Sequence, residues 1–296
     1  MHMEYVLNEL SLCGQYADRE QFATSGIKPL LGVIKTLSSF GVNDILKKST
    51  FYDSEVTKDM RLHELTKSRM SPAILAVCSQ LSKMQGEPFW DIKSGQQLGM
   101  RYFIQRLGED KATVDKDVTA TGVAEAYARK GCLISFRDGG YDGATEQVRR
   151  EDEPKYVEPA LTNLHDKYET AQFLFDSGQI DCKGYIMSRY CGKLVYDELS
   201  DNHGLNLVNS SNYRQFFDSF KNFEEYSWHQ IITSDGFDYK EFKKNKNTRS
   251  FFSPDLWAKG IHKFRVSQEI RCFGYREGEK FHLLRIDLDH LLSDKG

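Results

Sequence analysis

The sequence predicts an α+β protein, and three observations lead to this prediction. Apolar residues keep helical spacing in several segments before residue 225, whereas strict alternation marks the segment 263–287. Of the 296 residues, 40% are hydrophobic and 12% are aromatic, which is typical of a chain that buries a core. A chain of this length forms one large domain or two ordinary ones.

The predicted elements of the N-terminal part are both strands and helices. A strand is expected within 4–12 and a helix over 26–41, where a proline stands near the start and a glycine at the exit. The segment 71–86 has the strongest local helix pattern of the chain. A further helix over 122–130 leads into a buried strand at 132–136.

The charged stretch 149–159, which holds two prolines, is the predicted domain boundary. Residues 1–155 are expected to form an N-terminal mixed α/β domain. Residues 156–296 are expected to form a C-terminal α+β domain that ends in a basic antiparallel hairpin. The Gly-rich segment 137–147 lacks the GK[ST] signature of a phosphate loop and is predicted to be an ordinary loop.

In the C-terminal domain, helical spacing indicates helices around 161–175 and 213–223. The stretch 181–199 is predicted to form a short pair of strands. A single helical turn is expected at 253–260, where a serine caps the start and a glycine follows the end. Two alternating strands then form the hairpin, and they are joined by a turn at 276–280.

Strict alternation assigns the hairpin side chains to two faces. Arg271 and Tyr275 share one face of the first predicted strand, and Arg285 lies across from or diagonal to Arg271 on the second. His282 is expected to face away from Arg285 unless a bulge shifts the register. His262 and His290 lie just outside the predicted strands and are freer to reach this face, so we place both ahead of His282 as candidates for its chemistry.

Charge is distributed unevenly along the chain. The whole sequence has a formal net charge of −3, yet residues 239–285 hold seven Lys and five Arg against four Glu and one Asp, a local charge of +7. Such a segment is typical of an anion-binding surface. The alternative is a solvated sheet face on which Glu269 and Asp287 pair with the arginines of the hairpin.

The cysteines and the hydropathy pattern bear on localisation. No apolar run reaches 18 residues, and the N-terminus lacks the pattern of a secretory signal, so neither a membrane partner nor secretion is expected. Scattered cysteines without a CxxC motif predict free thiols and a cytoplasmic protein. These cysteines are Cys13, Cys78, Cys132, Cys182, Cys191 and Cys272.

Two acidic patterns were considered as metal sites. Asp235 followed by Glu241-Phe-Lys243 is spaced too closely for the separate strands of a restriction-type nuclease. The run 287–290, Asp-Leu-Asp-His, is better explained as a solvated strand end than as a set of ligands. We therefore expect neither a metal nor another cofactor.

The sequence FRVSQEIRCFGYREGEKFHLLRIDLDH, residues 264–290, resembles the terminal hairpin of RelE-type toxin ribonucleases. The resemblance covers about residues 257–293. It is carried by Arg271, by the Phe-Gly-Tyr of 273–275, by the apolar positions of 281–286 and by His290. It implies a bacterial RNA-cleaving toxin or phage-defence effector, with RNA or another nucleic acid as partner and an inhibitory protein as a further partner. It also implies that residues 1–155 have a sensor or partner-binding role.

Metal-free RNA cleavage needs a proton acceptor, a proton donor and a cation, and the C-terminal part supplies all three types of group. The candidate catalytic residues are Arg271, Arg285, His290, His262 and Tyr275, and the candidate substrate-binding residues are Arg265, Lys263, Arg249, Lys243 and Lys244. Two alternatives stay open: a nucleic-acid-binding module without catalysis, and a protein–protein adaptor that uses the same basic face.

Overall fold

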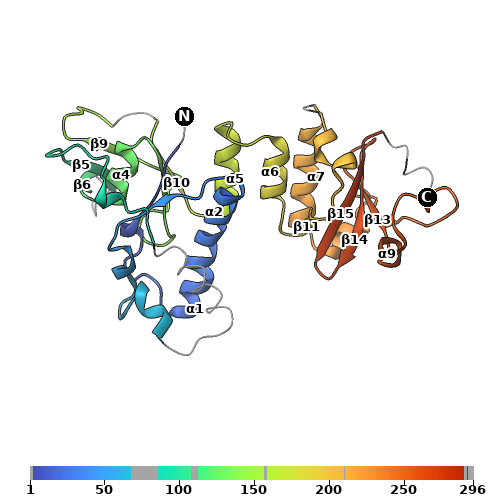
Figure 1. Cartoon of the computed structure of the whole chain (residues 1–296), viewed down its shortest axis with the longest axis horizontal. Coiled ribbons are helices and arrows are strands. Elements are labelled where there is room, and N and C mark those ends of the chain that lie inside the picture. Colours follow the sequence, from blue (N-terminus) through green and yellow to red (C-terminus); the bar gives the residue numbers. More distant parts are fainter. Residues whose placement is uncertain are drawn as a thin grey trace. The chain divides into compact units, whose positions relative to one another are not determined.

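A computed structural model describes residues 3–67, 86–107, 113–156, 159–209, 211–289 and 292. The chain forms two compact units, Met1–Thr170 and Ala171–Gly296, and both combine helices with sheets (Figure 1). The α+β prediction is therefore confirmed. The division falls inside helix α5 (Lys167–Asp176) rather than in the stretch 149–159, because residues 161–164 form a strand of the first unit's sheet.

The first unit is built on a five-stranded sheet with strand order β2-β1-β7-β10-β8. Its strands are β1 (Tyr5–Leu7), β2 (Ile45–Leu46), β7 (Cys132–Ile134), β8 (Thr145–Glu146) and β10 (Leu161–Leu164). The first four strands in this order pair in parallel, and β8 pairs antiparallel with β10. Strands of a parallel sheet are buried on both faces, and every residue of β1 and β7 is buried.

The other described elements of this unit are short, apart from α2. The helices are α1 (Arg19–Gln21), α2 (Lys28–Ser39) and α4 (Gly122–Ala128), and a π-helical segment, Phe22–Ile27, leads into α2. Two smaller sheets contain β3 (Glu55–Thr57) with β4 (Met60–Arg61), and β5 (Tyr102–Leu107) between β6 (Thr113–Asp117) and β9 (Val148–Arg150). The 3-10 helical segments are Glu9–Ser11, Phe51–Asp53, Leu62–Lys67 and Trp90–Ile92.

The predicted first strand, the helix over 26–41 and the helix–strand pair over 122–136 are confirmed. The helix predicted for 71–86 lies outside the described residues except for its last position. In the segment predicted as helix from 161 to 175, the first residues instead form β10, and α5 begins only at Lys167. Side chains such as Leu161 and Leu164 are buried in that strand, so an apolar spacing shared by helix and strand misled the prediction.

His165 follows β10 at the carboxyl end of the parallel sheet and is fully buried. Its Nδ1 lies 3.0 Å from a Glu169 carboxylate oxygen, and its Nε2 lies 2.6 Å from the Tyr141 carbonyl oxygen. Both partners are acceptors, so both ring nitrogens donate and the ring is an imidazolium. Arg137 holds the other Glu169 oxygen at 2.5 Å. This network ties the Gly-rich loop after β7 to the start of α5.

The network should stabilise the fold within a defined pH window. Burial opposes the charge on His165, but the bonds to Glu169 and Tyr141 outweigh it and raise the pKa above 6.5. Burial likewise disfavours the Glu169 carboxylate, yet His165 and Arg137 lower its pKa to about 2. The imidazolium contributes below pH 6.5 and is lost as pH rises through its raised pKa. The carboxylate contributes above pH 4.5 and is lost as pH falls towards 2.

We therefore expect the wild type to exceed His165→Gln in free energy of unfolding most strongly between pH 4.5 and 6.5. The difference should shrink as the pH is raised, and denaturant unfolding across the pH range measures it. A difference that stays constant up to pH 9 would show that His165 is held in its neutral form.

The second unit is built on a five-stranded sheet with strand order β11-β15-β14-β13-β12. Its strands are β11 (Leu194–Val195), β12 (Lys240–Glu241), β13 (His262–Arg265), β14 (Arg271–Glu277) and β15 (Lys280–Asp287). Its helices are α6 (Cys182–Arg189), α7 (Tyr213–Glu225), α8 (Trp228–Thr233) and α9 (Pro254–Ala258), and the 3-10 turns are Asp201–His203 and Leu205–Leu207. Only β11 runs parallel to its neighbour, β15.

Two predictions for this unit are wrong. The stretch 181–199 is not a strand pair: Asp181 caps α6 by accepting a hydrogen bond from the Gly184 amide, and only β11 is extended. The first hairpin strand is not continuous either. The amide of Val266 bonds back to the Ile270 carbonyl, and this turn divides the predicted strand into β13 and β14.

Apolar residues cover both faces of this sheet. Phe223 of α7 packs on Phe264 of β13 with ring centroids 4.6 Å apart, on one face. On the other face, Trp257 of α9 stacks on Phe242, which packs against Phe273 of β14. Figure 1 shows α7 and α9 on either side of the strands. The helical spacing at 213–223 and the cap at Ser253 predicted both helices correctly.

A β-bulge changes which hairpin side chains share a face. Phe273 pairs with Arg285, but Gly274 pairs with Leu283, so β15 has one extra residue at this point. After the bulge Tyr275 pairs with His282. Because residues 273 and 275 share a face of β14, His282 lies on the same face as Arg285, and the prediction that it faces away is wrong.

Candidate functional site

Four side chains meet beside the bulge, and we name them the Tyr275 cluster: Glu198, Lys259, Tyr275 and His282. The Tyr275 hydroxyl donates to a Glu198 carboxylate oxygen at 2.5 Å and accepts from the Lys259 ammonium at 2.8 Å. The rings of Tyr275 and His282 stack at 4.6 Å, only 2° from parallel. Four parts of the unit supply these groups: the segment after β11, the end of α9, and the strands β14 and β15.

The hydrogen bonds and charges of the cluster keep Glu198 ionised as a carboxylate and Lys259 protonated as a cation. The hydrogen bond from Tyr275, followed by the charge of Lys259, lowers the pKa of Glu198. The bond to Tyr275 and the charge of Glu198 raise the pKa of Lys259. Burial and the bond to Glu198 raise the pKa of Tyr275, so its hydroxyl stays protonated. At neutral pH the cluster therefore holds a proton acceptor and a cation, joined by a phenol.

The His282 ring sits between two carboxylates. Its Nδ1 lies 4.0 Å from Glu198, and its Nε2 lies 3.4 Å from Glu277. The side chain is 19% exposed, so the ring can exchange protons with solvent. In its protonated form His282 can donate a proton to an oxygen placed beside Glu198.

Arg285 and His203 extend this face of the sheet. The Arg285 guanidinium lies over the Phe251 ring, and its Nε is buried without a hydrogen-bond partner among the described residues. Burial lowers the pKa of Arg285, whereas Asp287 acts in the opposite sense. Burial and the Arg285 charge lower the pKa of His203. A cation and a neutral imidazole thus lie along the same face as the Tyr275 cluster.

Two of the candidate cations are buried. Arg271 is 5% exposed, and its Nη1 donates to the carbonyls of Ser267, Gln268 and Ile270, which brace the turn between β13 and β14. Lys263 is 4% exposed, and its ammonium lies over the Phe242 ring. Cross-strand pairing places Arg271 between Arg265 and Asp287. These positions favour a structural part for Arg271 and Lys263.

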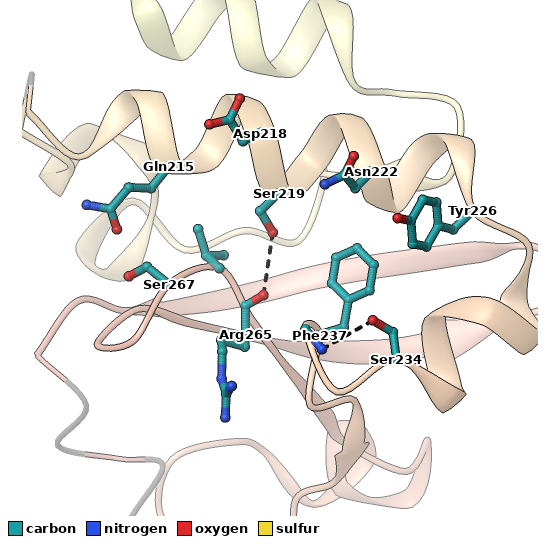
Figure 2. Close-up of a pocket in the computed structure, with 11 residues that line it drawn as sticks. Gln215, Asp218, Ser219, Asn222, Tyr226, Ser234, Phe237, Arg265 and Ser267 are labelled. Atoms are coloured by element: carbon teal, nitrogen blue, oxygen red, sulfur yellow. Dashed lines mark hydrogen bonds between the residues drawn. The ribbon is translucent and has the colours of Figure 1, made fainter.

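Arg265 borders a pocket of about 420 Å³ without pointing its charge into it. Figure 2 shows the guanidinium directed away from α7, and it pairs with Asp238 at 3.6 Å. Ser219 of α7 donates to the Arg265 carbonyl instead (Figure 2). The helix side of the pocket carries Gln215, Asp218 and Asn222, so this pocket presents amides and a carboxylate rather than cations (Figure 2).

The other site residues predicted from the sequence lie at the surface, on the face of the sheet opposite Tyr275, or outside the described residues. Lys243, Lys244 and Arg249 are exposed on one loop between β12 and α9, together with Lys246. His262 pairs with Gly274 and so faces away from Tyr275, on the side of the sheet that α7 covers. His290 lies outside the described residues.

Glu198 and Lys259 were not among the site residues predicted from the sequence. Lys259 was visible as a cation at the end of a helical turn, which is a common surface position. Glu198 follows a two-residue strand and has no local signal. Its hydrogen bond to Tyr275 spans 77 positions of the chain, and such a pairing is decided by the tertiary fold.

Among the described residues, no group of three or more His, Cys, Asp or Glu side chains is arranged to hold a metal ion. None of the described helices combines the length and apolar character needed to cross a bilayer.

No family model, curated protein or solved structure matches the chain.

Proposed function

We propose that the second unit cleaves RNA phosphodiester bonds without a metal, at the Tyr275 cluster. One observation carries the proposal: the bulge at Gly274 brings His282 onto the face that holds Tyr275, Glu198 and Lys259. A carboxylate, an imidazole and an ammonium group then stand within reach of one substrate phosphate. Positioned proton transfer and charge stabilisation are what this reaction needs.

In the proposed reaction, Glu198 accepts the proton of the ribose 2′-hydroxyl while the 2′-oxygen attacks phosphorus. Protonated His282 donates to the 5′-oxygen as the bond between phosphorus and that oxygen breaks. Lys259 stabilises the negative charge that builds on the phosphoryl oxygens. Tyr275 positions Glu198 and Lys259 through its two hydrogen bonds. The products are a 2′,3′-cyclic phosphate and a free 5′-hydroxyl.

Three further features support a nucleic-acid substrate. The exposed loop cations Lys243, Lys244 and Arg249 lie in the segment of net charge +7, which suits a phosphate backbone. Segment 257–293 resembles the hairpin of RelE-type toxin ribonucleases. The described cysteines are all free, which fits a cytoplasmic protein. A bacterial toxin or phage-defence role, controlled by an inhibitory protein, follows from that resemblance.

The direct test incubates the purified protein with mixed RNA, with and without EDTA. We expect cleavage in both conditions and 2′,3′-cyclic phosphate ends on the products. The rate should persist as pH falls from 7 to 5, because Tyr275 and Lys259 lower the pKa of Glu198 below 4.5. A histidine base would lose activity over this range.

The outcomes separate the competing functions. Cleavage that disappears with EDTA would contradict the proposal and favour a metal-dependent nuclease. RNA binding without cleavage would indicate the non-catalytic module, and its affinity should fall steeply with salt. A tight protein complex without RNA binding would indicate the adaptor.

A further inference from the structure

A second pocket, of about 450 Å³, lies at the end of the hairpin on the face opposite the Tyr275 cluster. It is lined by Ile232, Tyr239, His262, Arg276 and Gly278. Its volume falls within the range of about 300–1,000 Å³ that small-molecule sites occupy. The proposed proton transfers use none of these residues.

The pocket combines flat rings with a cation. Tyr239 and His262 stack at 5.1 Å and 15°, and in the described part of the chain no other ring packs on His262. The Nδ1 of His262 donates to the Gly260 carbonyl, which fixes the plane of the imidazole. Planar, oriented rings at a pocket wall are the groups on which nucleobases stack.

Arg276 supplies the charge. Its guanidinium lies 4.1 Å from the centroid of the Trp228 ring, and its Nε donates to the Gly278 carbonyl. These contacts fix the position of a side chain that lines the pocket. Arg276 forms an ion pair with Glu279 at 3.6 Å, and Glu279 is 80% exposed, so a phosphate can compete for the outer nitrogen atoms of the guanidinium.

We infer that this pocket is a nucleotide subsite, in which a base of single-stranded RNA stacks beside His262 and the adjoining phosphate binds Arg276. The identity of the ligand as RNA rests on the proposed function. Arg276 directly follows Tyr275 in β14, so an RNA strand that passes around the turn of the hairpin contacts the subsite and the cluster within neighbouring nucleotides.

The test uses a fluorescein-labelled 2′-O-methyl RNA oligonucleotide, which has no 2′-hydroxyl and so cannot be cleaved by the proposed route. Arg276→Met should raise its Kd about tenfold or more and reduce the salt slope by about one phosphate contact. His262→Ala should raise the Kd about tenfold with the salt slope unchanged, because it removes a stacking surface. Lys221→Met, which removes the same charge from an exposed position of α7, should leave the Kd unchanged.

Circular dichroism shows whether each variant is folded. In the wild type, the bound oligonucleotide should quench the fluorescence of Trp228, because the Trp228 ring contacts Arg276. An unchanged Kd for folded Arg276→Met and His262→Ala overturns the subsite, as does a wild type that does not bind the oligonucleotide. Equal binding of the DNA counterpart overturns the assignment to RNA. Binding that depends on these residues, in a protein that cleaves no RNA, retains the subsite and removes the proposed reaction.

Discussion

Replacing Glu198 with glutamine should lower the rate of RNA cleavage by about 10²–10⁴-fold, the usual contribution of a positioned general base. Glutamine keeps an oxygen that accepts the hydrogen bond from Tyr275, so the cluster retains its geometry while its proton acceptor is lost. Single-turnover kinetics with a defined RNA measures the chemical step directly. The Kd of 2′-O-methyl RNA should change far less than the rate, because the pocket of His262 and Arg276, which Glu198 does not line, also binds the strand.

A matched control is Glu269→Gln, which makes the same chemical change at an exposed turn position of the same unit. Its cleavage rate should equal that of the wild type. Lys259→Met should also lower the rate, because it removes the cation bound to Tyr275. Wild-type rates in Glu198→Gln would exclude Glu198 as the base and leave His203, on the same face, as the next candidate.

The second large effect is expected from Gly274→Ala, which should destabilise the second unit by about 3 kcal/mol or more. A Cβ at this position would lie 2.0 Å from the backbone oxygen of His282. Because that atom belongs to the backbone, no side-chain rotation can relieve the clash. The strands would have to separate at the bulge, which also moves His282 away from Tyr275. Denaturant unfolding, followed by the fluorescence of the tryptophans, measures the loss.

Gly278→Ala is the control for this change within the same hairpin. Gly278 has a positive φ of 57°, but an added Cβ would meet no atom within 4 Å. Its cost should therefore be limited to the backbone strain of about 1–2 kcal/mol. An effect of Gly274→Ala no larger than that of Gly278→Ala would show that the bulge is not held as tightly as the contact implies.

The sequence by itself predicted those elements whose signals are local. Helical spacing in α2 and α7, the serine cap of α9 and the alternation in β15 each arise within one turn of helix or a few strand residues. Local signals gave wrong predictions where the same apolar pattern fits both a helix and a strand. The apolar residues of 181–199 suited strands, but Asp181 accepted the bond that begins a helix.

Only part of the site could be predicted from the sequence, because only part of it depends on local signals. Tyr275 and Arg285 were recognised because they stand in the hairpin itself, and His262 was recognised as a histidine beside it. The face on which each lies depends on one extra residue in β15, and Gly274 permits it because a side chain there would strike the facing strand. An alternating sequence pattern does not show where a strand contains an extra residue, so His282 was assigned to the wrong face.

Only the tertiary structure decided which distant groups complete the cluster. Glu198 reaches Tyr275 because β11 pairs alongside β15, and Lys259 reaches it because α9 packs on Phe242 and Phe273 through its tryptophan. The burial of Arg271 and Lys263 was decided in the same way, by what packs over the sheet. The sequence specified which chemical groups the hairpin carries, whereas pairing and packing across the fold determined which of them meet, because those contacts join residues far apart in the chain.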